Sequence, residues 1–249
     1  MEQQTLLFRC RKNTKYNIDA FCRNCVNGTI YSEFLPYGEL NVWIPPKFLE
    51  ENGVPKEKGE STTNNLINNC ANNYYLACFS LTNPLTNRHL LIKYGGRDGF
   101  IIIYDYSLLR NDVSRESLVN NKIVDLLKVH YSDRKYSLIP LIEQLLEIAE
   151  ESDRDGEPFE EKATHYIETR QLSDEAGKRA MGIFCNKTNQ YKIENEVRLV
   201  MQKINQHNKY PDLIQAKPIG VLISNKMNLF SRKRIEDHAH EIGIMVEYY

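Results

Sequence analysis

The sequence lacks a long hydrophobic run. None of its 249 residues lies in an apolar stretch that approaches the roughly 20 residues needed to cross a membrane. Near the N-terminus, the apolar run at residues 6–8 is too short to be the core of a signal peptide. These absences argue against a membrane span and a secretory leader, so we expect a soluble, cytoplasmic protein.

The sequence also lacks the local signatures of common cofactor sites and catalytic sites. It has no GxSxG elbow and no HExxH pair. The glycines of KYGGRDGF, residues 93–100, precede a predicted strand, and no Lys-Ser or Lys-Thr follows them as in a phosphate-binding loop. This segment is more typical of a hairpin turn. Any chemistry must therefore come from residues that are distant in the sequence.

Cysteine is present but does not form a metal-binding pattern. The six cysteines include one CxxC pair, Cys22 and Cys25, and no second pair stands at ordinary zinc spacing. In a chain of this size we expect reduced cysteines in the core or in loops. The sequence therefore predicts no metal site.

Opposite charges are separated along the chain, although the net charge is only −1. Residues 143–175 hold twelve acidic and three basic side chains, whereas residues 178–234 hold twelve basic and three acidic ones. The two segments are either solvated or packed against each other, or the basic segment binds a polyanion such as nucleic acid or a dinucleotide.

Hydrophobic periodicity predicts a mixed α+β protein. We expect strands at residues 6–11, 29–31, 75–81, 100–105, 196–202, 219–223 and 244–248. We expect helices at residues 115–129, 138–151, 164–182 and 232–242, and a short one in the Asn-rich segment 61–75. Residues 151–162 read as an exposed loop. Because strands and helices do not alternate strictly, the pattern does not favour a doubly wound sheet.

Two carboxylates stand two positions apart in QYKIENEVRLV, residues 190–200. In a strand, Glu194, Glu196 and Arg198 would share one face, while Val197 and Leu199 would face the core. The pair could be a solvated edge that Arg198 and Lys192 neutralise, or it could be a functional site.

Four segments resemble a widespread bacterial family of poorly characterised domains: LLFRCR, GTIYSEF, ACFS followed by KYGGRDGFIIIYD, and KTNQYKIENEVRLV. The family's Lys, aromatic and Glu-x-Glu-x-Arg positions fall on Lys187, Tyr191, Glu194, Glu196 and Arg198. The same landmarks are similar to the Arg-Ser-Glu type of ADP-ribosyltransferase. LFRC is similar to the first strand, CFSLT to the serine strand, and ENEV to the Glu-x-Glu segment.

The resemblance implies a fold and a site. The fold would be a split, curved mixed β-sheet with flanking helices, in one domain at residues 1–249 with a mostly helical insertion at about 107–185. Arg9, Ser80 and Glu196 would converge on one cleft, with Glu194 as the auxiliary carboxylate. The residues implied to bind NAD are Arg9, Cys10, Arg11, Ser80 and Tyr94. Residues such as Tyr94, Tyr31 and Phe79 are more often core aromatics than nicotinamide-binding side chains.

The implied activity is transfer of ADP-ribose from NAD to a macromolecule. A carboxylate beside the ribose would stabilise the oxocarbenium-like transition state, and a second one would act on the nucleophile. The basic segment favours a nucleic-acid acceptor, RNA in particular, with a protein as the other option. The resemblance also suggests a toxin of an anti-phage or toxin-antitoxin system, with an antitoxin partner. The alternatives are an NAD glycohydrolase and a non-catalytic module that binds nucleic acid or a partner.

Overall fold

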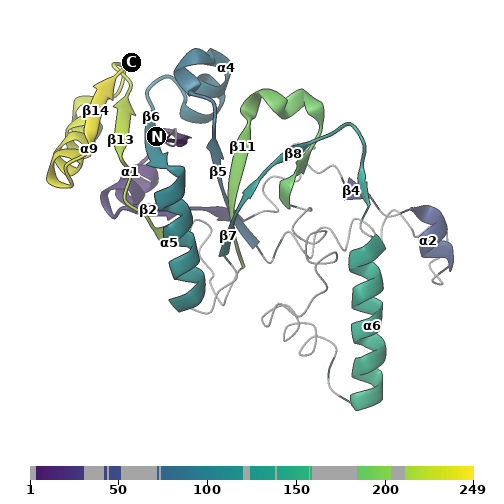
Figure 1. Cartoon of the computed structure of the whole chain (residues 1–249). Helices are drawn as coiled ribbons and strands as arrows, with labels where there is room; N and C mark the ends of the chain where they lie inside the picture. Colours follow the sequence, from purple (N-terminus) through teal and green to yellow (C-terminus); the bar gives the residue numbers. More distant parts are fainter. Residues whose placement is uncertain are drawn as a thin grey trace. The chain divides into compact units, whose positions relative to one another are not determined.

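A computed structural model of the chain describes residues 4–30, 42–43, 45–51, 72, 74–119, 124–137, 139–156, 158, 184–202 and 211–249 (Figure 1). The chain divides into two compact units. The first comprises residues 1–30, 75–128 and 191–249, and the second comprises residues 31–74 and 129–190.

A mixed sheet of eight strands forms the centre of the first unit, in the order β14-β13-β6-β1-β5-β11-β7, with β3 also paired to β5. The strands are β1 (Leu6–Arg11), β3 (Thr29–Ile30), β5 (Tyr74–Ser80), β6 (Phe100–Asp105), β7 (Val124–Lys128), β11 (Glu196–Gln202), β13 (Gly220–Ile223) and β14 (Met245–Tyr248). β1 lies antiparallel to both β5 and β6, whereas β13 and β14 are parallel. A separate antiparallel ribbon joins β2 (Cys25–Asn27) to β12 (Asp212–Gln215).

One face of this sheet carries the main core and is covered by helices. α1 (Lys15–Cys22), α5 (Tyr106–Val119) and α9 (Leu229–Glu241) contribute buried residues to it. Alternate positions of the strands face these helices, for example Leu7 of β1, Phe79 of β5 and Val197 of β11. The Thr14 side chain caps α1 by accepting a hydrogen bond from the Asn17 amide.

The other face carries a smaller hydrophobic cluster of Phe8, Ile101, Ile103 and Leu222. Leu91 packs against it from a run of short helices, which are η2 (Pro84–Thr86), α4 (Arg88–Leu90) and η3 (Leu91–Gly95). The predicted hairpin turn at residues 93–100 is therefore wrong. Its first half is helical, and the strands on either side of the segment, β5 and β6, are both neighbours of β1 and not of each other.

In its described residues, the second unit has two small parallel strand pairs and two helices. β8 (His130–Tyr131) pairs with β10 (Asn186–Lys187), and β4 (Val42–Trp43) pairs with β9 (Tyr136–Ser137). The helices are α2 (Pro46–Glu51) and α6 (Ile139–Asp155). The helical insertion at about 107–185 stays a prediction. Residues 107–128 cluster with the first unit, and residues 31–74 cluster with the second.

The mixed α+β class predicted from the sequence is confirmed, and the large mixed sheet with flanking helices agrees with it. One predicted helix, at residues 115–129, is wrong in its second half, because β7 occupies residues 124–128. The predicted helix at 164–182 and most of the Asn-rich segment 61–75 lie outside the described residues. Among the residues that the structure describes, no helix is both long and apolar enough to cross a membrane.

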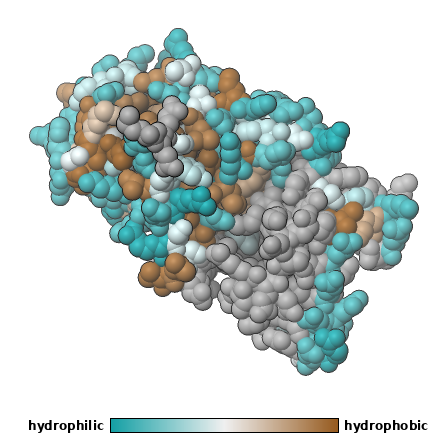
Figure 2. Space-filling model, in the orientation of Figure 1, coloured by the Kyte–Doolittle hydropathy of each residue, from teal (hydrophilic) through white to brown (hydrophobic). Residues whose placement is uncertain are grey.

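Hydrophobic side chains also reach the surface of the first unit, where Figure 2 shows them beside hydrophilic ones. The most exposed large ones include Leu118 and Val119 at the end of α5, and Leu229 and Phe230 at the start of α9.

Candidate carboxylate site

The two glutamates of the Glu-x-Glu segment lie on different elements. Glu194 ends the 3-10 helix η4 (Asn189–Glu194), and Glu196 begins β11. Between them, Asn195 has a φ of 42°, in the left-handed region that Asn tolerates better than most residues. The expectation that both carboxylates follow one strand face is therefore wrong for Glu194, because the backbone turns at Asn195.

Glu196 is held by a buried arginine. Arg198 Nε donates to Glu196 Oε1 at 2.9 Å, and a second nitrogen of the same guanidinium donates to Oε2 at 3.3 Å. The Arg198 side chain is 0% exposed and that of Glu196 is 5% exposed. Because β11 lies between β5 and β7 in the sheet, the alternative of a solvated edge strand is also wrong. Two parallel hydrogen bonds fix the position of this carboxylate.

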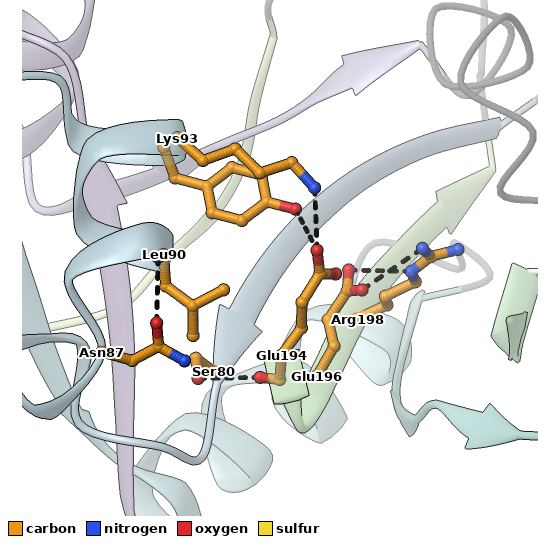
Figure 3. Close-up of polar contacts among 8 residues, drawn as sticks. Ser80, Asn87, Leu90, Lys93, Glu194, Glu196 and Arg198 are labelled. Atoms are coloured by element: carbon orange, nitrogen blue, oxygen red, sulfur yellow. Dashed lines mark hydrogen bonds and ion pairs between the residues drawn. The ribbon is translucent and has the colours of Figure 1, made fainter. Parts of the chain in front are cut away.

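Glu194 is held by two different donors from η3. Its Oε1 accepts from Lys93 Nζ at 2.9 Å and from the Tyr94 hydroxyl at 2.6 Å. Figure 3 shows Lys93 reaching the Glu194 carboxylate. The carboxylate side chain is 7% exposed, whereas that of Lys93 is 36% exposed. The ammonium of Lys93 also lies over the rings of Tyr94 and Tyr191. Separate cations thus allow the two carboxylates to be buried near each other.

Ser80 joins β5 to this segment. Its hydroxyl contacts the backbone carbonyl of Glu194 at 2.8 Å and that of Thr82 at 2.9 Å, and it accepts from the Thr82 amide. The amide of Leu81 donates to the carbonyl of Asn195, which adds a second link. Ser80 therefore contacts the backbone of the Glu-x-Glu segment, and backbone groups engage its hydroxyl.

Arg9 and Arg11 lie on the opposite face of the sheet. Phe8 pairs with Ser80, so Phe8 and Ser80 share a face, and the neighbouring Arg9 must point to the other. The guanidinium of Arg9 lies over the ring of Phe79, which belongs to the main core. The structure therefore brings Ser80, Glu194 and Glu196 together but does not bring Arg9 to them.

The two β1 arginines donate to polar groups, and among the described residues neither forms an ion pair with a carboxylate. Arg9 donates to the carbonyl of Asn27, and Arg11 donates to the side chain of Asn17. Burial lowers the pKa of Arg9, and burial together with the charge of Arg9 lowers the pKa of Arg11 to about 9. Within the described part of the chain, Nε and one terminal nitrogen of Arg9 have no hydrogen-bond partner, nor does Nε of Arg11.

The remaining NAD-contact candidates, Cys10 and Tyr94, are both near the short helices of the smaller cluster. Cys10 packs against that cluster, and a Cβ placed on Gly95 would lie 3.7 Å from it. Burial raises the pKa of its thiol to about 12, so Cys10 stays protonated and is a poor nucleophile. Tyr94 is 37% exposed, which distinguishes it from a core aromatic.

Among the described residues, the basic side chains of α9 lie away from the carboxylates. Arg232, Lys233 and Arg234 lie on α9, whose buried residues belong to the main core on the opposite face. Arg234 pairs with Asp19 of α1, and Arg198 pairs with Glu196 in the interior. Some of the basic side chains of the basic segment therefore form ion pairs within the protein.

Sequence reasoning missed Lys93 and treated Tyr191 only as part of a motif. The segment KYGG is typical of a turn. Its lysine-tyrosine pair, which follows the predicted serine strand, was therefore not predicted to be part of the site. Among the described residues, no group of three or more His, Cys, Asp or Glu side chains is placed to hold a metal ion.

Comparisons with family models, with curated proteins and with solved structures find no match for this chain. The site therefore has to be interpreted from its own geometry.

Proposed function

We propose that the chain is an NAD-dependent ADP-ribosyltransferase whose reacting groups are Glu194 and Glu196. The observation that carries the proposal is the close pair of buried carboxylates, each held by its own cation. Burying two carboxylates costs folding free energy, even when they are paired, and hydrophobic residues would serve stability as well. A functional use explains the arrangement better than stability does.

The proposed reaction breaks the bond between nicotinamide and ribose and forms a bond between ribose and the acceptor. Positive charge develops on the ribose as nicotinamide leaves as a neutral molecule, so the leaving group needs no general acid. Glu196, which Arg198 holds in place, would stabilise this charge and bind a ribose hydroxyl. Preorganisation matters here, because a fixed carboxylate need not reorganise as the charge appears.

Glu194 would act on the acceptor by taking its proton. Lys93 and Tyr94 position its carboxylate, and both are partly exposed, so an acceptor could approach from their side. Arg9 and Arg11 have no part in this proposal, because they lie on the other face of the sheet. A split, curved sheet of the ADP-ribosyltransferase kind remains part of the proposal, which the resemblance in the sequence supports.

The acceptor is proposed to be a macromolecule, either a nucleic acid such as RNA or a protein. The test is incubation of the purified chain with NAD labelled on its adenylate portion, together with RNA, DNA or protein from whole cells. Label retained on one class would support transfer and identify the acceptor. Nicotinamide release without retained label would support the glycohydrolase alternative. The absence of both would contradict an NAD-dependent enzyme and leave the binding module.

We propose further that this activity makes the chain a toxin of a bacterial anti-phage or toxin-antitoxin system. Modification of an essential RNA or protein is catalytic, so a few molecules would be enough to stop growth. A protein of this kind needs an inhibitory partner in the cell that makes it.

A further inference from the structure

The ammonium of Lys93 is surrounded by groups that bind cations. Its Nζ lies 2.9 Å from Glu194 Oε1. It lies 4.8 Å from the ring centroid of Tyr94 and 5.4 Å from that of Tyr191. Both ring distances fall within the about 6 Å over which a cation is attracted to an aromatic face.

These groups do not come together through local sequence alone. Tyr94 follows Lys93 in η3, but Tyr191 and Glu194 belong to η4, and Lys93 and Glu194 are 101 positions apart. Figure 3 shows Lys93 from one side meeting the Glu194 carboxylate from the other. The fold therefore builds one carboxylate and two aromatic rings around a single position.

We propose that Tyr94, Tyr191 and Glu194 form a binding site for an organic cation, and that Lys93 occupies this site when no ligand is bound. A lysine side chain is flexible, and this one is 36% exposed, so it can move into solvent. After it leaves, the Tyr94 hydroxyl still donates to Glu194, which keeps the carboxylate in place. Lys93 thus acts as a replaceable internal ligand.

The chemistry of the site favours a flat, delocalised cation. An aromatic face stacks on a planar cation such as guanidinium, which is also more weakly hydrated than an ammonium. Two sources supply such a group, the pyridinium ring of NAD and an arginine side chain of an acceptor. This choice between biological cations rests on the proposed function, whereas cation binding itself does not.

The experiment compares the wild-type chain with Lys93→Met, which removes the internal ligand but keeps the length of the side chain. Each is titrated with 1-methylnicotinamide and with methylguanidine, and binding is followed by calorimetry. Nicotinamide and methylurea are the neutral controls of matched shape. We expect Lys93→Met to bind at least one cation about tenfold more tightly than the wild type does, and neither variant to prefer a neutral control.

Two further variants allow the titrations to support or contradict the cation site. Lys93→Gln serves in place of Lys93→Met if the latter does not fold, since it retains a donor toward Glu194. Tyr191→Leu added to the Lys93 variant should abolish the gain, because it removes one ring. A folded Lys93 variant that binds the cations no better than the neutral controls would overturn the inference.

The same titrations separate this inference from the proposed function. Tighter binding of 1-methylnicotinamide assigns the site to the donor, and tighter binding of methylguanidine assigns it to the acceptor. Cation binding in a chain that never releases nicotinamide from NAD would contradict the enzyme but keep the site. NAD turnover in a chain that binds neither cation would support the enzyme and contradict the cation site.

Discussion

At the scale of single residues, two buried arginines are in opposite electrostatic situations. Arg198 is wholly buried and makes two hydrogen bonds to Glu196. Arg9 is only 3% exposed, yet it contacts a backbone carbonyl and an aromatic ring, and its neighbour Arg11 has the same charge. Burial compensated by a carboxylate and burial without one should have different effects on stability.

We therefore expect Arg198→Leu to destabilise the chain by about 3–5 kcal/mol, because it leaves the carboxylate of Glu196 buried and unpaired. Arg9→Leu should be neutral or stabilising, since it removes an uncompensated cation from the core and relieves Arg11. Urea denaturation followed by circular dichroism measures both. A larger loss for Arg9→Leu than for Arg198→Leu would contradict this account of the two sites.

Substitution of each carboxylate should affect the reaction rates differently. Glu196→Gln keeps the shape but removes the charge proposed to face the ribose, so transfer should fall by about two to three powers of ten. Glu194→Gln should reduce transfer to the acceptor more than slow hydrolysis of NAD by water, because its proposed role concerns the nucleophile. Both rates are measured with labelled NAD on variants of matched thermal stability. Equal and mild effects would mean that the pair has no catalytic role.

At the scale of elements, the start of α5 depends on a single carboxylate. Asp105 Oδ1 accepts from the amide of Leu108 at 2.9 Å, and this backbone hydrogen bond lowers the pKa of Asp105. A lowered pKa means that the contribution to stability is complete above the unfolded pKa near 3.9 and is lost as the pH falls through the folded pKa. We expect Asp105→Ala to cost about 1 kcal/mol at pH 7 and less at pH 3.

Asp105→Asn is the matched control for this cap. The amide oxygen still accepts from the helix, so stability at pH 7 should be close to that of the wild type, while the acid-dependent part of the loss should disappear. Thermal melts at several pH values between 2.5 and 7 provide the comparison. A loss for Asp105→Ala that stays constant with pH would contradict the role of the ionised carboxylate.

Gly99 fixes the position of η3 relative to the sheet. A Cβ at Gly99 would overlap the carbonyl oxygens of Gly95 and Arg11, which are backbone atoms and cannot yield without moving η3 or β1. Gly99→Ala should therefore destabilise the chain by at least 1–3 kcal/mol and displace Lys93 and Tyr94. Gly220→Ala is the control, because its nearest neighbour is the flexible end of Met245. Equal melting temperatures for the two variants would contradict this.

The elements also show what sequence patterns can and cannot predict. β1, β6 and β11 were predicted with their observed bounds, because alternating or continuous apolar residues identify strands that pack on a core. The turn at Asn195 was not predicted, since the 3-10 helix before it depends on contacts with distant segments. The sequence therefore identified both glutamates and Arg198 as a partner, but it could not predict that Lys93 pairs with Glu194.

At the scale of the whole molecule, the toxin proposal has a direct test in cells. Induced expression of the wild-type chain in a bacterium without a partner should reduce colony counts by several powers of ten, because catalysis multiplies the effect of each molecule. Glu196→Gln, expressed to the same level, should restore growth. Equal growth of both strains, or equal killing by both, would contradict a toxicity that depends on the carboxylate.

Lys93 and Glu194 lie 101 positions apart, so the ribosome synthesises Lys93 well before Glu194. At about 5–20 residues per second, roughly 5–20 s pass between them. β1, β5 and β6 are complete before β11 exists, so much of the sheet is available to pair early. A nascent chain therefore has structure before it has a carboxylate site. An inhibitory partner of the proposed toxin that recognises β1 or β6 would have time to bind before the carboxylate site is complete.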